Sequence, residues 1–241
     1  MKKQLVFFFV FLFFTQWANS QSSDLEKYGI GFLIPEKGAQ ELCINFPAAV
    51  FDLYDTPGGN KIGTLYKKNF ANLMYSLQKN AASFRIRNED MAEFQNKTFF
   101  LKYFEEKNGV LKVLANSTGR GFWISKKDLG YLRITTKSWF DFFVEKKESF
   151  YPSIDIGLNL REKPEAKSKK IALLKGDYYL VNLTGKTEGL WAEVIVKKYN
   201  SLPCKAKDIN TLKPVSEQSG WIKIVDDSGT PNIWFHIHGC K

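Results

Sequence analysis

The residue types best suited to metal chemistry gather at the C-terminal end of the chain. His236, His238 and Cys240 alternate, so on a strand their three side chains would project from one face. Two imidazoles and one thiol are zinc ligands, and this set is a candidate zinc site. A few ligand-type residues at this spacing are by themselves weak evidence for a metal site. We therefore expect an ordinary closing strand here, and we predict no metal and no cofactor.

Three possible catalytic arrangements are incomplete in this sequence. The His-x-His pair resembles that of the LytM-type peptidoglycan metallopeptidases, but those enzymes need a further His and the chain contains only 2. Cys43 could serve as the nucleophile of a Cys–His peptidase, yet the pattern of the NlpC/P60 family is not visible around it. No phosphate-binding glycine loop, nucleophile elbow or paired-carboxylate motif is present. We predict that the protein is not an enzyme.

A cluster of lysines lies in one short stretch of the second half of the chain. Such a surface would favour an anionic polymer such as peptidoglycan, a teichoic-like glycan or phospholipid head groups. The alternative is a solvated loop that keeps a β protein soluble and its sheet edges unpaired. The sequence leaves both interpretations open. The residues are Lys163, Lys167, Lys169, Lys170 and Lys175.

Aromatic rings present a similar choice between core packing and ligand binding. Tyr54 and Trp234 occupy positions where strand alternation could turn a ring outward, and exposed rings stack on sugars and peptides. We predict Tyr54, Arg161 and Trp234 as the first residues of a binding groove. The rings that we expect inside the barrels or at their ends are Trp123, Trp191 and Trp221.

The first 20 residues have the order of a secretory signal peptide. Lys2 and Lys3 precede an apolar run over residues 5–14, and the small residues Ala18 and Ser20 precede a cleavage point. The run is shorter than the roughly 20 apolar residues that span a bilayer. We predict cleavage after Ser20, export to the periplasm or beyond, and no transmembrane segment in the mature chain. Export also disfavours nucleic acid as a partner, despite the net charge of +10.

Export would place the 3 cysteines in an oxidising compartment. An odd number allows at most one bridge within the chain. We favour Cys204 with Cys240, which would close a loop of about 36 residues and stabilise the fold by roughly 3–4 kcal/mol. Cys43, beside Leu42 and Ile44, would then be a buried and inert thiol. The sequence does not fix the pairing.

Most of the chain after residue 45 consists of short apolar runs separated by Gly, Asn, Asp and Lys. The runs are rich in β-branched and aromatic residues and several alternate apolar with polar, which is typical of strands. Turn residues stand between them, as at 108–109 and 226–229. A short helix is suggested only over 88–95. The clearest runs are Ile62–Tyr66, Thr98–Phe104, Val110–Leu114, Gly121–Ile124, Tyr178–Leu183, Trp191–Val196 and Trp221–Val225.

The two halves of the chain carry related sequences. The spacing of about 107 residues is too long for one unit of a solenoid, so it indicates two copies of a small domain. The matching segments are Phe51–Pro57 with Leu158–Pro164, Lys61–Leu65 with Lys170–Leu174, and Gly121–Ile124 with Gly220–Ile222.

The second copy resembles a bacterial SH3 (SH3b) domain. Its opening, Leu158-Asn-Leu-Arg-x-x-Pro, is followed by a loop, Lys-Ile, an apolar pair and Lys175-Gly-Asp177. Trp191-Ala-Glu-Val194 and the later Gly-Trp-Ile also belong to that pattern. The first copy departs from it, because Tyr54 replaces the Arg and Lys-Gly-Asp is missing. The resemblance implies an all-β fold of two small SH3-like (SH3b) barrels in tandem, with inserts and an aromatic-rich connector.

These patterns together predict five segments. We expect a signal peptide over 1–20, an N-terminal segment over 21–45, a first SH3b-like domain over 46–130 with an insert at 67–96, a connector over 131–152, and a second SH3b-like domain over 153–241. The connector contains too many aromatic residues for a free linker, so we expect it to pack against one barrel.

The resemblance and the leader together imply an exported, non-enzymatic binding protein. The expected partner is an envelope glycan, peptidoglycan above all, or another envelope polymer. An alternative is an interaction or assembly module that binds an envelope protein in the periplasm and has no affinity for glycans. A cell-wall hydrolase, or an accessory to one, is a third class that would require a catalytic arrangement not visible in the sequence.

Overall fold

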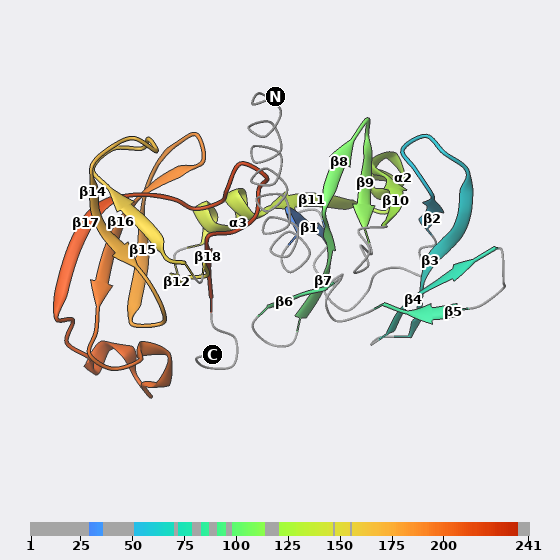
Figure 1. The fold of residues 1–241 in the computed structure, drawn as a ribbon. Helices are drawn as coiled ribbons and strands as arrows, with labels where there is room; N and C mark the ends of the chain where they lie inside the picture. Colours follow the sequence, from blue (N-terminus) through green and yellow to red (C-terminus); the bar gives the residue numbers. More distant parts are fainter. Residues whose placement is uncertain are drawn as a thin grey trace, which may run out of the picture. The chain divides into compact units, whose positions relative to one another are not determined.

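The computed structural model describes residues 29–35, 51–69, 72–78, 83–86, 91–94, 98–113, 121–146, 148–154 and 156–235. The predicted signal peptide lies outside these residues. The fold is mostly β, with three antiparallel sheets, one of them curled into a half-barrel, and few short helices (Figure 1). The chain divides into two compact units. Unit 1 comprises residues 1–92 and 98–136, and unit 2 comprises residues 93–97 and 137–241.

Unit 1 is built mainly on a seven-stranded sheet. Its core contains fully buried side chains that alternate along the strands, such as Phe51 and Leu53. This alternation is what one buried face of a sheet requires. In spatial order the strands are β5 (Ser83–Arg85), β4 (Asn72–Leu77), β3 (Lys61–Asn69), β2 (Phe51–Tyr54), β10 (Phe122–Ser125), β9 (Val110–Val113) and β8 (Glu105–Lys107).

A four-stranded sheet contains the segment for which the sequence suggested a helix. Residues 91–94, within the predicted helix over 88–95, form a strand, so that prediction is wrong there. Residues 91–94 pair with the strand that follows them in the sequence, β7 (Thr98–Tyr103), at the edge of the sheet, and this pairing decides for a strand. The strand order is β11 (Ile134–Ser138), β1 (Gly31–Pro35), β7 (Thr98–Tyr103) and β6 (Met91–Phe94).

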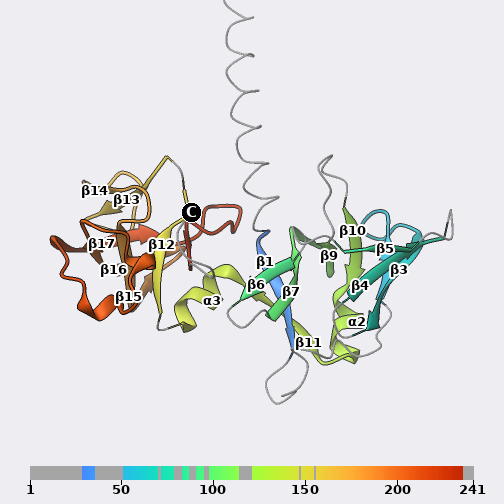
Figure 2. The same cartoon turned by 90° about the horizontal axis from the view of Figure 1, so that it is seen from below.

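Unit 2 contains a second seven-stranded sheet, with two 3-10 turns, η3 (Pro203–Lys205) and η4 (Ile209–Thr211), between β16 and β17. Ala192, Val194 and Val196 point to the core in strict alternation along β16. The strand order is β14 (Lys170–Leu174), β13 (Leu158–Arg161), β17 (Ser216–Lys223), β16 (Trp191–Lys198), β15 (Tyr179–Glu188), β12 (Ser149–Pro152) and β18 (Ile233–Trp234), seen from two directions in Figures 1 and 2.

The opening hairpins of the two units share one irregularity. In unit 1 the register of β2 with β3 shifts between Leu53 and Tyr54. In unit 2 the register of β13 with β14 shifts between Leu160 and Arg161. A bulge at the same point in both hairpins bends the strand and changes the direction of the next side chain. The related sequences of the two halves therefore fold into the same local geometry.

The similarity extends across five strands. Trp123 of β10 pairs with Tyr54 of β2, and Trp221 of β17 pairs with Arg161 of β13. The strand order β3-β2-β10-β9-β8 in unit 1 matches β14-β13-β17-β16-β15 in unit 2. The sequence repeat is therefore also a repeat of strand pairing.

Two short helices were not expected from the sequence. They are α2 (Lys126–Tyr131) and α3 (Trp139–Glu145), and each begins after a serine N-cap. In α3 the Ser138 hydroxyl accepts a hydrogen bond from the backbone N–H of Asp141 at 3.1 Å. Ser-x-x-Asp spacing before an apolar run is a known helix start, so this helix had a visible signal.

Helix α3 belongs to the core of unit 2, although it falls in the predicted connector. Trp139 and Phe143 are fully buried. The Trp139 ring lies 4.7 Å from Trp234 of β18, and the Phe143 ring lies 5.0 Å from Phe150 of β12. Residues 137–152 are thus a structural part of unit 2 rather than a linker.

Trp139→Ala should destabilise the protein by about 3–5 kcal/mol, because it removes a buried indole and leaves a cavity. The measurement is the free energy of unfolding in urea. Ile156→Ala is the matched control, since Ile156 is 80% exposed and its loss should change stability by less than about 0.5 kcal/mol. Equal effects of the two variants would contradict the placement of α3 in the core.

Candidate functional site

The predicted lysine cluster lies on the hairpin formed by β13, its loop and β14. We call residues 161–175 the basic hairpin. Backbone and side-chain bonds close the loop: the Glu162 N–H donates to the Lys169 carbonyl at 3.0 Å, and the Lys163 N–H donates to the Ser168 hydroxyl at 2.9 Å. Lys163, Lys167 and Lys169 lie on this exposed, internally bonded loop, Lys170 begins β14, and Lys175 follows the other end of that strand. The exposed lysines are Lys163, Lys167, Lys169, Lys170 and Lys175.

Arg161 supports this loop from below. Its side chain is half-buried, and its Nη1 donates to the carbonyl oxygen of Ser168 at 2.6 Å. The bulge just before Arg161 turns the side chain toward the loop that follows it. A guanidinium has five N–H donors, so this bond leaves capacity for other acceptors. The main effect of Arg161 is to hold the lysine-bearing loop in one conformation.

One lysine of the basic hairpin is already paired. Lys169 Nζ lies 2.7 Å from Glu162 Oε1, and both side chains are substantially exposed. The hydrogen bond to Glu162, together with its negative charge, raises the pKa of Lys169 above its ordinary value. Lys169 therefore stays cationic at neutral pH while part of its charge is balanced locally. Among the ion pairs between described residues, none joins an acidic side chain to any of the other four lysines of the hairpin.

The three residues predicted to form a groove lie on three different strands, β2, β13 and β18. Tyr54 lies in unit 1, at the position that Arg161 occupies in unit 2. Trp234 lies in β18, which is the opposite edge of the sheet order from β14. The Trp234 ring is half-buried and stacks on Phe235 at 4.9 Å. Trp234 is therefore largely occupied by core packing.

Leu173 is an exposed candidate contact residue that the sequence pattern marked only as part of an apolar pair. Leu173 of β14 is 40% exposed, whereas Leu174 beside it is fully buried. Alternation along the strand accounts for the difference, because successive side chains point to opposite faces. Period-two spacing in Lys170–Leu174 was the available signal, but the sequence could not tell which face was covered.

The C-terminal candidates fall outside the part of the chain that the structure describes. His236, His238 and Cys240 lie beyond residue 235, and Cys43 lies in the undescribed range 36–50. Cys204 is half-buried beside a cluster containing Tyr151, Leu180 and Tyr199. The Cys204–Cys240 bridge stays a prediction. Among the described residues, no group of three or more His, Cys, Asp or Glu side chains is arranged to hold a metal.

Two titratable groups of unit 2 outside the basic hairpin have shifted pKa values. Burial raises the pKa of Tyr151, with the charge of Asp177 adding to the effect. The Thr184 hydroxyl, followed by the Lys186 ammonium, lowers the pKa of Glu193 through hydrogen bonds. Each shift is explained by local packing or by a strand-surface contact.

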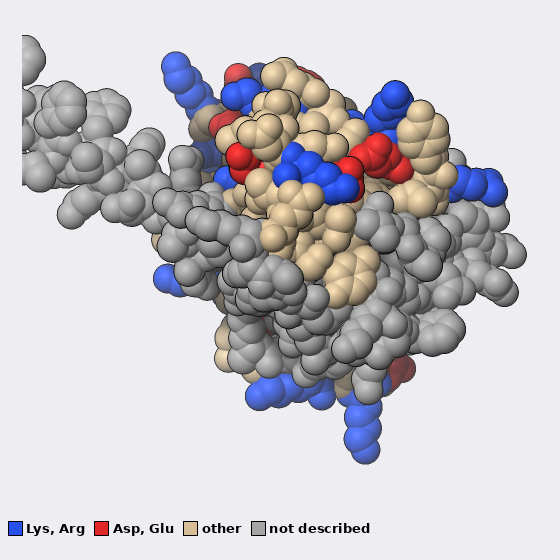
Figure 3. Space-filling view, turned by 90° about the vertical axis from the view of Figure 1, so that its right-hand side faces the viewer, with Lys and Arg blue, Asp and Glu red and all other residues tan. Residues whose placement is uncertain are grey.

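Charges of both signs mix on the surface. On the face drawn in Figure 3, basic and acidic side chains of the described residues lie side by side among neutral atoms. No helix within the described ranges is both long enough and apolar enough to cross a membrane.

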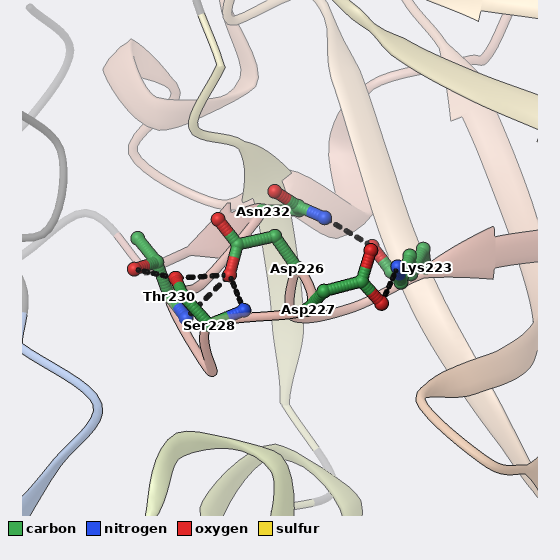
Figure 4. A network of polar contacts seen from close by, with 6 residues as sticks. All are labelled: Lys223, Asp226, Asp227, Ser228, Thr230 and Asn232. Carbon is green, nitrogen blue, oxygen red and sulfur yellow. Dashed lines mark hydrogen bonds and ion pairs between the residues drawn. The ribbon is translucent and has the colours of Figure 1, made fainter. Parts of the chain in front are cut away.

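A polar network after β17 shapes the predicted turn at 226–229 (Figure 4). Asp226 Oδ1 accepts from the Ser228 N–H at 2.8 Å, from the Ser228 hydroxyl at 2.6 Å and from the Thr230 N–H at 2.9 Å. Asn232 Nδ2 donates to the Lys223 carbonyl at 2.8 Å. The donors that surround the Asp226 carboxylate come from its own loop. The network therefore positions the chain for its return into β18.

Asp226→Ala should destabilise the protein by about 1–3 kcal/mol, because the buried Thr230 N–H loses its acceptor. Asp227→Ala is the neighbouring control. The Asp227 side chain is 92% exposed, and among the described residues its ion pair is with Lys223. Its loss should therefore cost less than about 1 kcal/mol. Thermal unfolding of both variants decides, and a larger effect at Asp227 would contradict the structural role of Asp226.

Comparisons with known proteins identify no family for the chain. No protein-family model matches it, and no curated protein or solved structure is significantly similar to it. The case for its function therefore rests on the basic hairpin, the repeated five-strand core and the sequence patterns themselves.

Proposed function

We propose that the protein is an exported, non-enzymatic binding protein that attaches to the cell envelope through the basic hairpin. Its ligand is peptidoglycan or another anionic polymer of the envelope. The observation that carries the proposal is the exposure of five lysines on the basic hairpin, three of them on an internally bonded loop that the Arg161–Ser168 hydrogen bond supports. Export rests on the leader predicted over residues 1–20.

The assignment of both units as SH3b-like domains is part of this proposal. Two observations support it. The motif Leu158-Asn-Leu-Arg with the later Gly-Trp-Ile resembles the SH3b pattern, and those segments form adjacent strands of one sheet, where Trp221 pairs with Arg161. Unit 1 repeats the same five-strand order with the same register shift. A duplicated small β domain is the simplest physical account of both.

The energetics of such a surface favour a polymer over a single small anion. One exposed ion pair contributes only about 0.5 kcal/mol, because water and salt screen it. Several lysines that meet successive charges of one polymer add their contributions without a new loss of translational freedom for each contact. The bonded loop also reduces the conformational entropy lost on binding. Binding should therefore weaken as ionic strength rises.

Two other classes of function are alternatives to envelope binding. A periplasmic interaction or assembly module without glycan affinity is favoured by one specific observation, the exposed Leu173 on the edge strand β14. A hydrolase ranks third, since the sequence lacks the third His that the resemblance to metallopeptidases would require. A hydrolase accessory would need a catalytic partner that the chain itself does not supply.

Retention of residues 21–241 on purified sacculi tests the proposal. The triple variant Lys163→Ala/Lys167→Ala/Lys170→Ala should weaken retention at low salt about tenfold, since three exposed contacts of about 0.5 kcal/mol each are lost. The matched control, Lys205→Ala/Lys207→Ala/Lys213→Ala, removes the same charge from other exposed positions of unit 2. We expect the control to stay within about twofold of the parent protein.

Two results would contradict envelope binding through this hairpin. One is the absence of retention at low salt, and the other is an equal loss in the two triple variants, which would indicate generic charge. A fall in the turbidity of the sacculi during the same incubation would instead establish a hydrolase. Wild-type circular dichroism in both triple variants is the control for folding.

A further inference from the structure

The outer edge of β14 is open in unit 2. Among the described residues, β14 is the terminal strand of its sheet and pairs with β13 alone, through residues 158–161 (Figure 2). An edge strand presents unpaired backbone N–H and C=O groups that can pair with another chain. β14 consists of Lys170–Leu174, and among the described residues its strand partners belong to β13.

Unit 1 shows what this edge can accept. Its counterpart of β14 is β3, and β3 pairs on its outer side with the antiparallel strand β4. The shared register places residues 63–65 of β3 where residues 172–174 of β14 lie. In unit 1 those residues pair with residues 75–77 of β4. Among the described residues, the same five-strand core thus carries an added strand in one copy and lacks one in the other.

We propose that the β14 edge of unit 2 binds an extended, acidic segment of another protein as an added antiparallel strand. This goes beyond attachment to an envelope polymer, because recognition uses the backbone of β14 as well as charge. Pairing of this kind takes its affinity from main-chain hydrogen bonds and its specificity from alternate side chains.

Leu173 supplies the apolar contact for the added strand. It is 40% exposed on an edge where proteins usually place charge. Its counterpart in unit 1 is Thr64, whose hydroxyl lies 3.1 Å from the Ser76 hydroxyl of the added strand. The side chain at this position therefore meets the neighbouring strand directly. In unit 2 a leucine at the same place favours an apolar residue on the incoming segment.

The charges that flank β14 select the occupant. Lys169 and Lys170 stand at its beginning and Lys175 follows its end, all exposed. A second copy added antiparallel about Ala172 would bring Lys169 opposite Lys175 at both ends, and like charges opposite one another are destabilising. An incoming strand with acidic residues at its ends meets lysines instead. Charge complementarity therefore favours an acidic partner over a second copy of this chain.

The test uses residues 21–241 and three fluorescent peptides. The first carries the β4 sequence with leucine in place of Ser76, Asn-Leu-Met-Tyr-Leu-Leu, because Ser76 lies opposite the counterpart of Leu173, and it has two glutamates at each end. The second has lysines in place of the glutamates. The third keeps the glutamates and has N-methylated backbone amides at alternate positions. We expect the first peptide to bind, and the other two to bind at least about tenfold more weakly in fluorescence anisotropy. Amide hydrogen exchange at 171–174 should slow on binding.

Leu173→Asn should weaken binding of the first peptide about tenfold. Val215→Asn is the matched control, since Val215 is also an exposed apolar residue of unit 2, at 50% exposure, and it should change the affinity by less than about twofold. Leu173→Asn changes no charge, so sacculus retention should stay within about twofold of the parent. This separates failure of strand addition from failure of envelope binding.

Any one of four results would overturn the proposal. The acidic peptide does not bind, the N-methylated peptide binds equally well, exchange at 171–174 is unchanged, or Leu173→Asn has no more effect than Val215→Asn. Self-association in sedimentation equilibrium that is lost in Leu173→Asn would assign the edge to a second copy instead of an acidic partner.

Discussion

The register between β13 and β14 is the constraint on which the rest of unit 2 depends. Up to Leu160 the alternation of β13 directs leucines into the core, and a slip of one residue would expose them. The register shift after Leu160 then bends the strand and sends Arg161 toward its own loop. One bulge thereby separates an apolar interior from a cationic exterior within a few residues. The same shift in unit 1 indicates that the geometry belongs to the core itself.

A second structural theme is the use of aromatic rings to join distant parts of the chain. Trp139 of α3 lies 4.7 Å from Trp234 of β18, and both pack near Phe143. β12, which follows α3, pairs with both β15 and β18. Residues 233–235 are thus fixed to a segment nearly a hundred positions earlier. Interactions of this length make folding slower but bind the whole unit into one cooperative structure.

The sequence predicted the features that depend on local pattern. Alternating runs marked most strands, Asp226 and its neighbours marked a turn, and the lysines of the basic hairpin were found together. It failed where packing or pairing with another element decides. Residues 91–94 form a strand that pairs with the next strand, β7, and the half-buried Trp234 packs against Trp139 of α3. Arg161 was expected to face a ligand, but only the bulge reveals that it holds Ser168.

The strand β4 has a consequence for the valency of the protein. Tandem copies of a binding domain ordinarily gain avidity, because the second contact forms at a high effective concentration. Here the edge of β3 is already filled by β4 from the same chain, while the matching edge of β14 is unfilled among the described residues. The duplication therefore yields two unequal copies. On the proposal above, the described residues of the repeated core offer one such edge, and we expect the chain to combine with such a partner in a one-to-one ratio.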